Sequence, residues 1–292
     1  MKRMGITLGA FFLLAIFGLS HEKTFSFVIS GGMTRLAPHD LNVFLQDYAR
    51  YYFSFAGLTG AAGRSDAPKT LRSSAEFELT LLFGAAPGLY LTLGSGFIGA
   101  GLESDPLLQS YSDLEVKLSR VDSIRSIPIR IGMLYSWPLT RRLSLRPHVS
   151  LDAYISSFKE TGYEERTDLE LNQRLAHDEW DIQTKAFSWG STWGLSLEVD
   201  LSTMVSLSLD GGYRRARLGS FHGTDVRFDN GVIESEGDFR LLHYEFYADW
   251  MKTGYNFLNL PMASGSTQLD IVRDAILDLS GPYLKGGLRV SF

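Results

Sequence analysis

The chain contains no cysteine among its 292 residues, which excludes disulfide bonds and cysteine-ligated metal sites. Beyond the first twenty residues it also lacks any run of eighteen apolar residues, so we expect no helical membrane span there. The formal net charge of -5 gives no reason to expect nucleic-acid binding. Aromatic residues, at 13%, and 29 glycines are present instead, a composition that favours β-strands joined by tight turns.

The first twenty residues, MKRMGITLGAFFLLAIFGLS, have the three parts of a secretory signal peptide. Lys2 and Arg3 form the positive region, and residues 5–19 form an apolar core that is short for a membrane-spanning helix. Small residues at Gly18 and Ser20 favour cleavage after Ser20. A retained membrane anchor is the alternative interpretation. We therefore divide the chain into a signal peptide, 1–20, and a mature domain, 21–292.

Apolar and polar residues alternate along much of the mature chain. In LSLRPHVSLDAYIS, residues 143–156, seven apolar residues or prolines occupy every second position. The segments FSWGSTWGLSLEV, residues 187–199, and GPYLKGGLRVSF, residues 281–292, repeat the pattern. A period of two is that of a β-strand with one apolar and one polar face, and a helix would not give it.

The alternating segments predict eight strands separated by connections of two lengths. The strands are expected at 24–34, 74–84, 88–101, 124–137, 142–158, 184–199, 204–218 and 282–292. Short connections at 84–88, 138–142 and 200–204 alternate with long ones, as in bacterial outer-membrane barrels. In lipid every backbone polar group must be paired, so the last strand has to close on the first. An even number of strands puts both termini on the periplasmic side.

The signal peptide, the up-and-down alternation and the final strand ending in Phe292 resemble the small outer-membrane β-barrel proteins of Gram-negative bacteria, of the OmpA/OmpW-like kind. The resemblance implies a multi-pass protein of the outer membrane, in contact with membrane lipid and lipopolysaccharide. It also implies that the barrel-assembly machinery reads an assembly signal in the last strand, formed by Leu284, Leu288, Val290 and Phe292. It brings no catalytic motif, cofactor or metal.

The predicted fold is therefore all-β: an eight-stranded antiparallel up-and-down transmembrane β-barrel with two short helices in external loops. Ten strands are the alternative, because residues 229–232, Asp-Asn-Gly-Val, are typical of a hairpin turn. That hairpin is expected to extend above the membrane. If it also crossed the membrane, it would add two strands to the barrel.

The polar faces of the strands carry a set of charged residues that would point into the barrel. An eight-stranded barrel has an interior just wide enough for side chains, so we expect these charges to pair in a salt-bridged lumen. A gated narrow pore is the alternative. The predicted lumen charge network comprises Glu76, Glu78, Arg130, Arg146, His148, Asp152, Glu198, Asp210, Arg214, Lys285 and Arg289.

His148, Ser150 and Asp152 share one face of one strand, which suggests a catalytic triad. Residues two apart on a strand are separated by roughly 6.5–7 Å. A triad needs hydrogen-bond contact from base to nucleophile, so we predict no catalytic residues there.

Two external loops contain apolar stripes at helical spacing. In the first, Asp40 is a candidate N-cap, and Phe44, Leu45, Tyr48 and Tyr52 lie on one face. In the last, Ser266 is the candidate N-cap and Gly281 the stop, and the stripe comprises Leu269, Val272, Ile276 and Leu279. Strand closure makes these loops neighbours, so we expect the two helices to pack as a cap over the external mouth. An apolar ligand site between the cap and the rim is the alternative.

These features favour a non-enzymatic surface protein for envelope integrity, adhesion or ligand contact, possessing a salt-bridged lumen and a helical external cap. One alternative is a narrow channel for small or apolar solutes. Another is a lipid-modifying enzyme at the outer rim, where His222 lies near Ser220 and His243 lies further along the same loop. Residues 159–183 carry a net charge of -5 and are expected to form a solvated acidic face.

Overall fold

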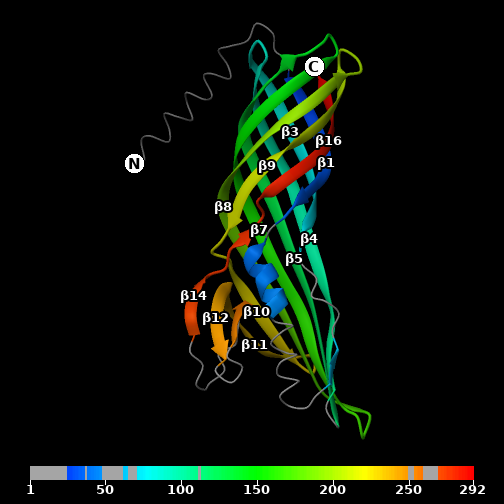
Figure 1. Ribbon diagram of the computed structural model, residues 1–292, viewed down its shortest axis with the longest axis vertical. Coiled ribbons are helices and arrows are strands. Elements are labelled where there is room, and N and C mark those ends of the chain that lie inside the picture. Colours follow the sequence, from blue (N-terminus) through cyan, green and yellow to red (C-terminus); the bar gives the residue numbers. More distant parts are fainter. Residues whose placement is uncertain are drawn as a thin grey trace.

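The computed structural model describes residues 25–36, 38–47, 62–64, 71–110, 113–248, 253–258 and 269–292. The predicted signal peptide, as well as Tyr48 and Tyr52, lies outside the described residues. Figure 1 shows a tall barrel of inclined strands, with a short helix and small strands gathered beside its lower half. No helix in the described part of the chain has the length and apolar character needed to cross a membrane.

Eight antiparallel strands close into a ring. Each strand pairs with the next in the order β1-β3-β4-β5-β7-β8-β9-β16, and β16 returns to pair with β1. The closing seam places Phe27 opposite Val290 and Met33 opposite Leu284. The strands are β1 (Phe25–Arg35), β3 (Ser73–Ala86), β4 (Leu89–Ser110), β5 (Leu114–Tyr135), β7 (Leu143–Asp168), β8 (Gln173–Asp200), β9 (Val205–Leu218) and β16 (Gly281–Ser291).

The ring has two unlike ends. At one end, here called the turn end, short connections at 87–88, 136–142 and 201–204 join the strands, and the Phe292 amide donates to the Phe25 carbonyl at 2.9 Å. At the other end β4, β5, β7 and β8 run far beyond their expected limits. β8 has 28 residues and spans roughly 90 Å. Polar residues lie on both faces of the outer parts of β7 and β8, so the apolar alternation fades there and gives no strand signal.

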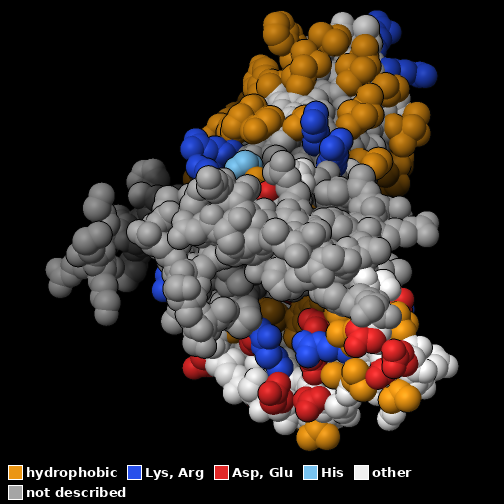
Figure 2. Space-filling view, turned by 60° about the horizontal axis from the view of Figure 1, so that its bottom comes forward, with side chains coloured by type: hydrophobic (Ala, Val, Ile, Leu, Met, Phe, Trp, Pro, Cys, Tyr) orange, Lys and Arg blue, Asp and Glu red, His pale blue; other side chains and the backbone are white. Residues whose placement is uncertain are grey.

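A belt of apolar side chains surrounds the half of the barrel nearest the turn end (Figure 2). Along β7 it runs from Leu143 to Ile155, which covers about 30 Å at a tilt of about 40°. Aromatic side chains lie at both borders. Phe25 and Phe292 stack near the turn end, and Phe187 and Trp189 meet edge to face at the far border. We call the part of the barrel beyond this far border the outer extension.

A hairpin of β10 (His222–Asp229) and β11 (Val232–Arg240) belongs to the outer extension and not to the ring. Its turn uses Asn230 and Gly231 with φ of 48° and 82°, which agrees with the predicted hairpin turn. β10 pairs with β8 from Lys185 outwards, where β9 has already left β8. The two extra strands of the ten-strand alternative therefore do not enter the ring.

Three short strands pair with ring strands without joining the ring. β2 (Ala62–Arg64) pairs with the outer part of β4, and β6 (Trp137–Pro138) pairs with β7 at the turn end. β15 (Leu277–Asp278) pairs with the last residues of β9. These pieces extend the sheet locally and leave the order of the eight strands unchanged.

The first predicted loop helix corresponds to a helix over residues 39–47, whereas the second prediction is wrong. Residues 269–274 form β14 (Leu269–Asp274), which pairs with β12 (Leu242–Ala248), and β12 pairs in turn with β13 (Thr253–Leu258). The neighbouring β12 satisfies the backbone groups that a helix would satisfy internally. Leu277 and Leu279 are buried with Asp278 between them, which is the period of a strand. The predicted helical stripe included Leu279 but not Leu277.

An apolar core fills the ring where the outer extension begins. The helix 39–47 contributes Leu41 and Phe44, and the segment after β14 contributes Ala275, Leu277 and Leu279. We call this core the apolar plug. Residues of the barrel wall that point inwards also belong to it, among them Ile98, Ile124, Tyr154, Phe158, Ala186, Ala216 and Leu218. Asp40 joins its two loops, because its carboxylate accepts hydrogen bonds from Arg273 at 2.7 and 2.9 Å and from the Ile276 amide at 2.8 Å.

The closing seam depends on close backbone approach at Gly32. A Cβ there would collide with the carbonyl oxygen of Leu284, whereas at Gly31 the nearest atom is 3.8 Å away. We expect Gly32→Ala to lower the free energy of unfolding in detergent by about 1–3 kcal/mol, because backbone cannot yield as a flexible side chain does. Gly31→Ala is the matched control. Urea titration followed by heat-modifiable gel mobility measures both, and equal stability of the two variants would contradict the packing argument.

Candidate functional site

The charged residues of the lumen lie on inward-facing positions of six strands, β3, β5, β7, β8, β9 and β16. β3 contributes Glu76 and Glu78, and β5 contributes Arg130. The register of the sheet sets Arg130 opposite Asp152 of β7, and Asp210 of β9 opposite Lys285 of β16. Alternation gives the inward direction, and the register decides which charges share a level of the barrel.

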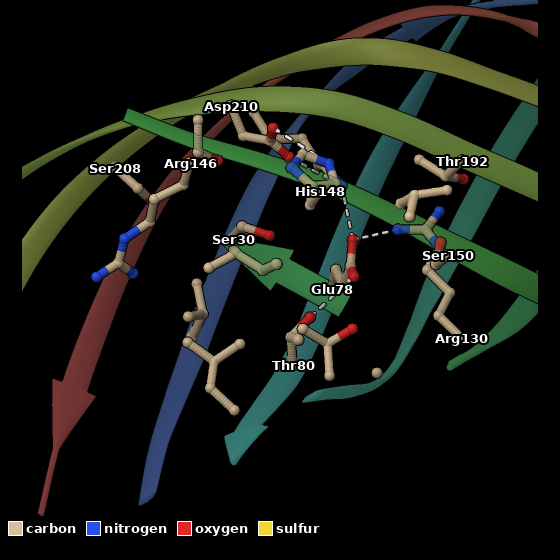
Figure 3. Close-up of a pocket in the computed structure, with 18 of the residues that line it drawn as sticks. Ser30, Glu78, Thr80, Arg130, Arg146, His148, Ser150, Thr192, Ser208 and Asp210 are labelled. Carbon is tan, nitrogen blue, oxygen red and sulfur yellow. Dashed lines mark hydrogen bonds and ion pairs between the residues drawn. The ribbon is translucent and has the colours of Figure 1, made fainter. Parts of the chain in front are cut away.

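A central network of ion pairs crosses the lumen (Figure 3). Arg130 donates to Glu78 and, at 2.9 Å, to Glu76, and its Nε lies 3.6 Å from Asp152. Arg214, which is fully buried, donates to the other oxygen of Glu76 at 2.9 Å. Lys285 donates to Glu78 at 2.6 Å. Charges from opposite walls therefore neutralise one another across the barrel, as a buried charge requires.

The Asp152 carboxylate is held by hydroxyl groups of its neighbours. Ser150, Tyr154 and Thr192 all donate to its carboxylate, at 2.7, 2.8 and 2.5 Å. His148 instead contacts the Tyr283 hydroxyl at 2.9 Å and lies 3.6 Å from Asp210. Ser150 reaches Asp152 because its side chain leans along the strand. His148 points elsewhere, so the three residues form no triad.

A second charge cluster lies nearer the turn end. Glu198 pairs with Arg146 at 2.5 Å and with Arg289 at 3.1 Å, and Asp200 lies 3.8 Å from Arg289. Between the two clusters is a cavity of about 100 Å³. Hydroxyl groups line much of it, including those of Ser30, Thr80, Thr92 and Ser208. A space of this size and polarity suits a few ordered waters.

A third cluster in the outer extension was missed from the sequence. Glu160, Asp122 and Arg120 are buried there, with Arg120 at 2.9 Å from Glu160 and 2.7 Å from Asp122. Trp180 donates to Glu160 at 2.9 Å. Residues 159–183 were expected to form a solvated acidic face, whereas Glu160 is buried. The alternation of Arg120 and Asp122 with apolar Val121 was the available signal for a strand.

Burial raises the pKa of Glu160 to about 7. Arg120 opposes this change, while the negative charges of Asp122 and Asp225 add to it. The pKa of Asp40, in helix 39–47, changes in the opposite direction. Burial also acts to raise its pKa, but the hydrogen bonds from Arg273 and the Ile276 amide outweigh burial and hold the pKa below its usual range.

The predicted external sites are only partly described. Phe44 and Leu45 are buried in the apolar plug, Ile276 is half-buried, and the side chains of Leu269 and Val272 lie outside the description. Ser220 donates to Asp274 at 2.9 Å. His222 is exposed on the barrel wall and His243 is buried, so the structure forms no Ser–His pair from Ser220 and these histidines.

The predicted assembly signal lies on the last strand. Its residues Leu284, Leu288 and Phe292 are exposed and point outwards, and Val290 is half-buried. Among the residues that the structure describes, no group of three acidic or histidine side chains is arranged to hold a metal ion.

Removing one partner of the central network leaves an uncompensated buried charge. We expect Arg214→Met to reduce the free energy of unfolding by about 3–5 kcal/mol, because Glu76 loses a neutralising partner. Adding Glu76→Gln is expected to restore much of that loss. The matched control is Arg215→Met, the same chemical change on the outward face, with an effect below about 1 kcal/mol. Urea titrations in detergent compare all three, and no recovery in the double variant would argue against a coupled network.

The raised pKa of Glu160 makes a prediction for stability against pH. The folded state holds the proton up to about pH 7, whereas an ordinary carboxyl releases it near 4.5. Folding therefore favours the protonated form, and stability falls as pH rises through that window. We expect Glu160→Gln, which can still accept from Trp180, to weaken this dependence.

Hydrogen exchange of the outer parts of β7 and β8 at pH 5 and pH 8 measures the dependence. Glu170→Gln, in the exposed turn, is the control. A slope equal in wild type and Glu160→Gln would contradict the assignment.

Comparison with known proteins finds similarity at the level of the fold. No protein-family model matches this chain, and no curated protein matches it. The chain is similar to a major outer membrane protein from Thermus thermophilus, with 15% identity and a TM-score of 0.37, over 93% of this chain and 100% of that one. It is also similar to the outer membrane protease OmpT from Escherichia coli, with 6% identity and a TM-score of 0.27, over 94% and 98% of the two chains.

Proposed function

We propose that this chain is an outer-membrane β-barrel protein that acts as a non-enzymatic surface protein. The closed ring supports membrane insertion, because it pairs every strand on both sides and leaves no open edge in the bilayer. The apolar belt supports it further, since it has a height close to the bilayer's hydrocarbon core and aromatic side chains at both borders. Both termini of the ring then lie on the periplasmic side.

The observation that carries the proposal is that the lumen is closed twice along its length. The ion pairs around Arg130 cross it within the belt, and the apolar plug fills it where the outer extension begins. A solute crossing the barrel would have to separate buried ion pairs and displace a packed core. This favours a silent barrel over the alternative of a narrow channel.

The working surface is then the outer extension. The long hairpin of β7 and β8 and the hairpin of β10 and β11 project beyond the belt, and the Asp40–Arg273 link holds the two cap loops together. These features suit envelope integrity, adhesion or ligand contact. The lipid-modifying alternative has less support, because among the described rim residues Ser220 donates to Asp274 and makes no hydrogen bond with His222 or His243.

Single-channel recording in planar bilayers tests the closed lumen. We expect no conductance steps from wild-type protein that is folded by heat-modifiable gel mobility. Steps from such protein would overturn the silent barrel in favour of the channel. Mass spectrometry of lipid A from expressing cells covers the other alternative, and a new lipid A mass that depends on the chain would overturn the non-enzymatic role.

A further inference from the structure

Two basic residues flank a serine in one row across the outer wall, just beyond the belt. In the sheet register Arg125 of β5 lies opposite Ser157 of β7, and Ser157 lies opposite Lys185 of β8. Arg125 and Lys185 are exposed, and their chain neighbours on both sides are buried, so both side chains point outwards. Strands lie about 4.8 Å apart, which separates the two Cα atoms by about 10 Å.

These two cations have no acidic partner in the part of the chain that the structure describes. Three other basic side chains of the outer extension have acidic partners: Lys159 with Asp181 at 3.0 Å, Arg166 with Glu164 at 2.7 Å, and Arg227 with Asp225 at 2.9 Å. Arg125 and Lys185 make no ion pair or hydrogen bond of this kind. Their charge is available to an external anion.

An apolar strip lies next to this row, on the side toward the turn end. Two residues along each strand, Ile127 faces Ile155 and Ile155 faces Phe187, all three about half-exposed. Trp189 follows on β8 and is 70% exposed. Figure 2 shows blue Lys and Arg side chains along the lower border of the orange apolar surface. The wall of β5, β7 and β8 thus has a cationic row that borders an apolar strip on the side away from the turn end.

We propose that this wall binds a phosphorylated membrane lipid, with the phosphate between Arg125 and Lys185 and the acyl chains along Ile127, Ile155 and Phe187. Arg and Lys bind phosphate through charge-assisted hydrogen bonds, and the Ser157 hydroxyl is a further donor in the same row. The occupant needs an anionic head and an apolar body, because a free anion would leave the apolar strip without a partner. The proposal rests on the membrane placement proposed above.

The cationic row continues around the wall. His222 of β10 lies opposite Lys185, and Arg215 and Arg217 lie on the outward face of β9. Arg217 is paired with Asp278 at 3.6 Å, whereas Arg215 has no partner among the described residues. The Arg125–Ser157–Lys185 row is the part of this border where two cations and a hydroxyl lie in register above apolar residues.

Native mass spectrometry of the detergent-solubilised protein titrated with phosphatidic acid tests the proposal. We expect a bound phosphatidic acid whose affinity falls about thirtyfold in the Arg125→Gln/Lys185→Gln variant, since each of the two cations near a lipid surface contributes about 1 kcal/mol. Arg141→Gln/Arg142→Gln, with two exposed cations removed at the turn end, is the matched control and should bind as wild type does. Brominated phosphatidic acid should also quench the fluorescence of the exposed Trp189.

Other results of this titration would overturn the proposed lipid site. Equal loss in both double variants, or no preference for phosphatidic acid over phosphatidylcholine, would overturn the site. Displacement of the lipid by an equal concentration of inorganic phosphate would overturn the lipid as occupant and leave a simple anion site. Heat-modifiable mobility and insertion into vesicles are measured on the same samples. A protein that inserts but lacks the preference refutes this site alone, and one that fails to insert refutes the proposed membrane placement.

Discussion

The closure of β16 onto β1 is the constraint on which the rest of the structure depends. Each strand of the ring can pair its backbone groups with two neighbours only if the last strand returns to the first. In a bilayer an unpaired edge would cost several kcal/mol for each exposed backbone group. Gly32 allows the two backbones of the seam to approach closely, so a residue without a side chain contributes to the closure of the whole ring.

Closure at eight strands fixes a narrow interior, and the narrow interior determines how charge is held there. Arg130, Arg214 and Lys285 share Glu76 and Glu78 from opposite walls, so each carboxylate meets more than one cation. Removing water from such groups is costly, and dense mutual pairing offsets the cost. The same density leaves only the cavity of about 100 Å³ between the two clusters. A narrow ring therefore requires the charges of its inner face to pair with one another.

The outer extension follows different rules because it lies beyond the apolar belt, outside the proposed bilayer. There β9 leaves the side of β8, and β10 takes its place at Lys185. The ring can open at this level because exposed edges are tolerated in water. Helix 39–47 and the segment 275–279 occupy the space inside the wall, and Arg120 lies over the Phe44 ring at 4.2 Å, which joins the apolar plug to the buried carboxylates above it. Glu160 is buried beside Arg120, which packs on Phe44, so its burial depends on neighbours from other parts of the chain.

The sequence by itself determined the features that depend on alternation. A period of two identified all eight ring strands and the inward direction of Glu76, Arg130 and Lys285, because neighbouring side chains on a strand must point to opposite faces. It identified the hairpin turn at Asn230–Gly231 because that turn needs residues that accept positive φ.

Only the tertiary structure decided what depends on register and on distant neighbours. The outer parts of β7 and β8 are polar on both faces, so pairing and not pattern made them strands. Residues 269–274 carried a helical stripe, yet β12 beside them offered partners for their backbone. The partners of Glu160 come from β5 and β8. Arg125 and Lys185 come into one row because β7 pairs with both of their strands. Contacts between residues so far apart in the chain have no local signature, because they exist only once the sheet is assembled.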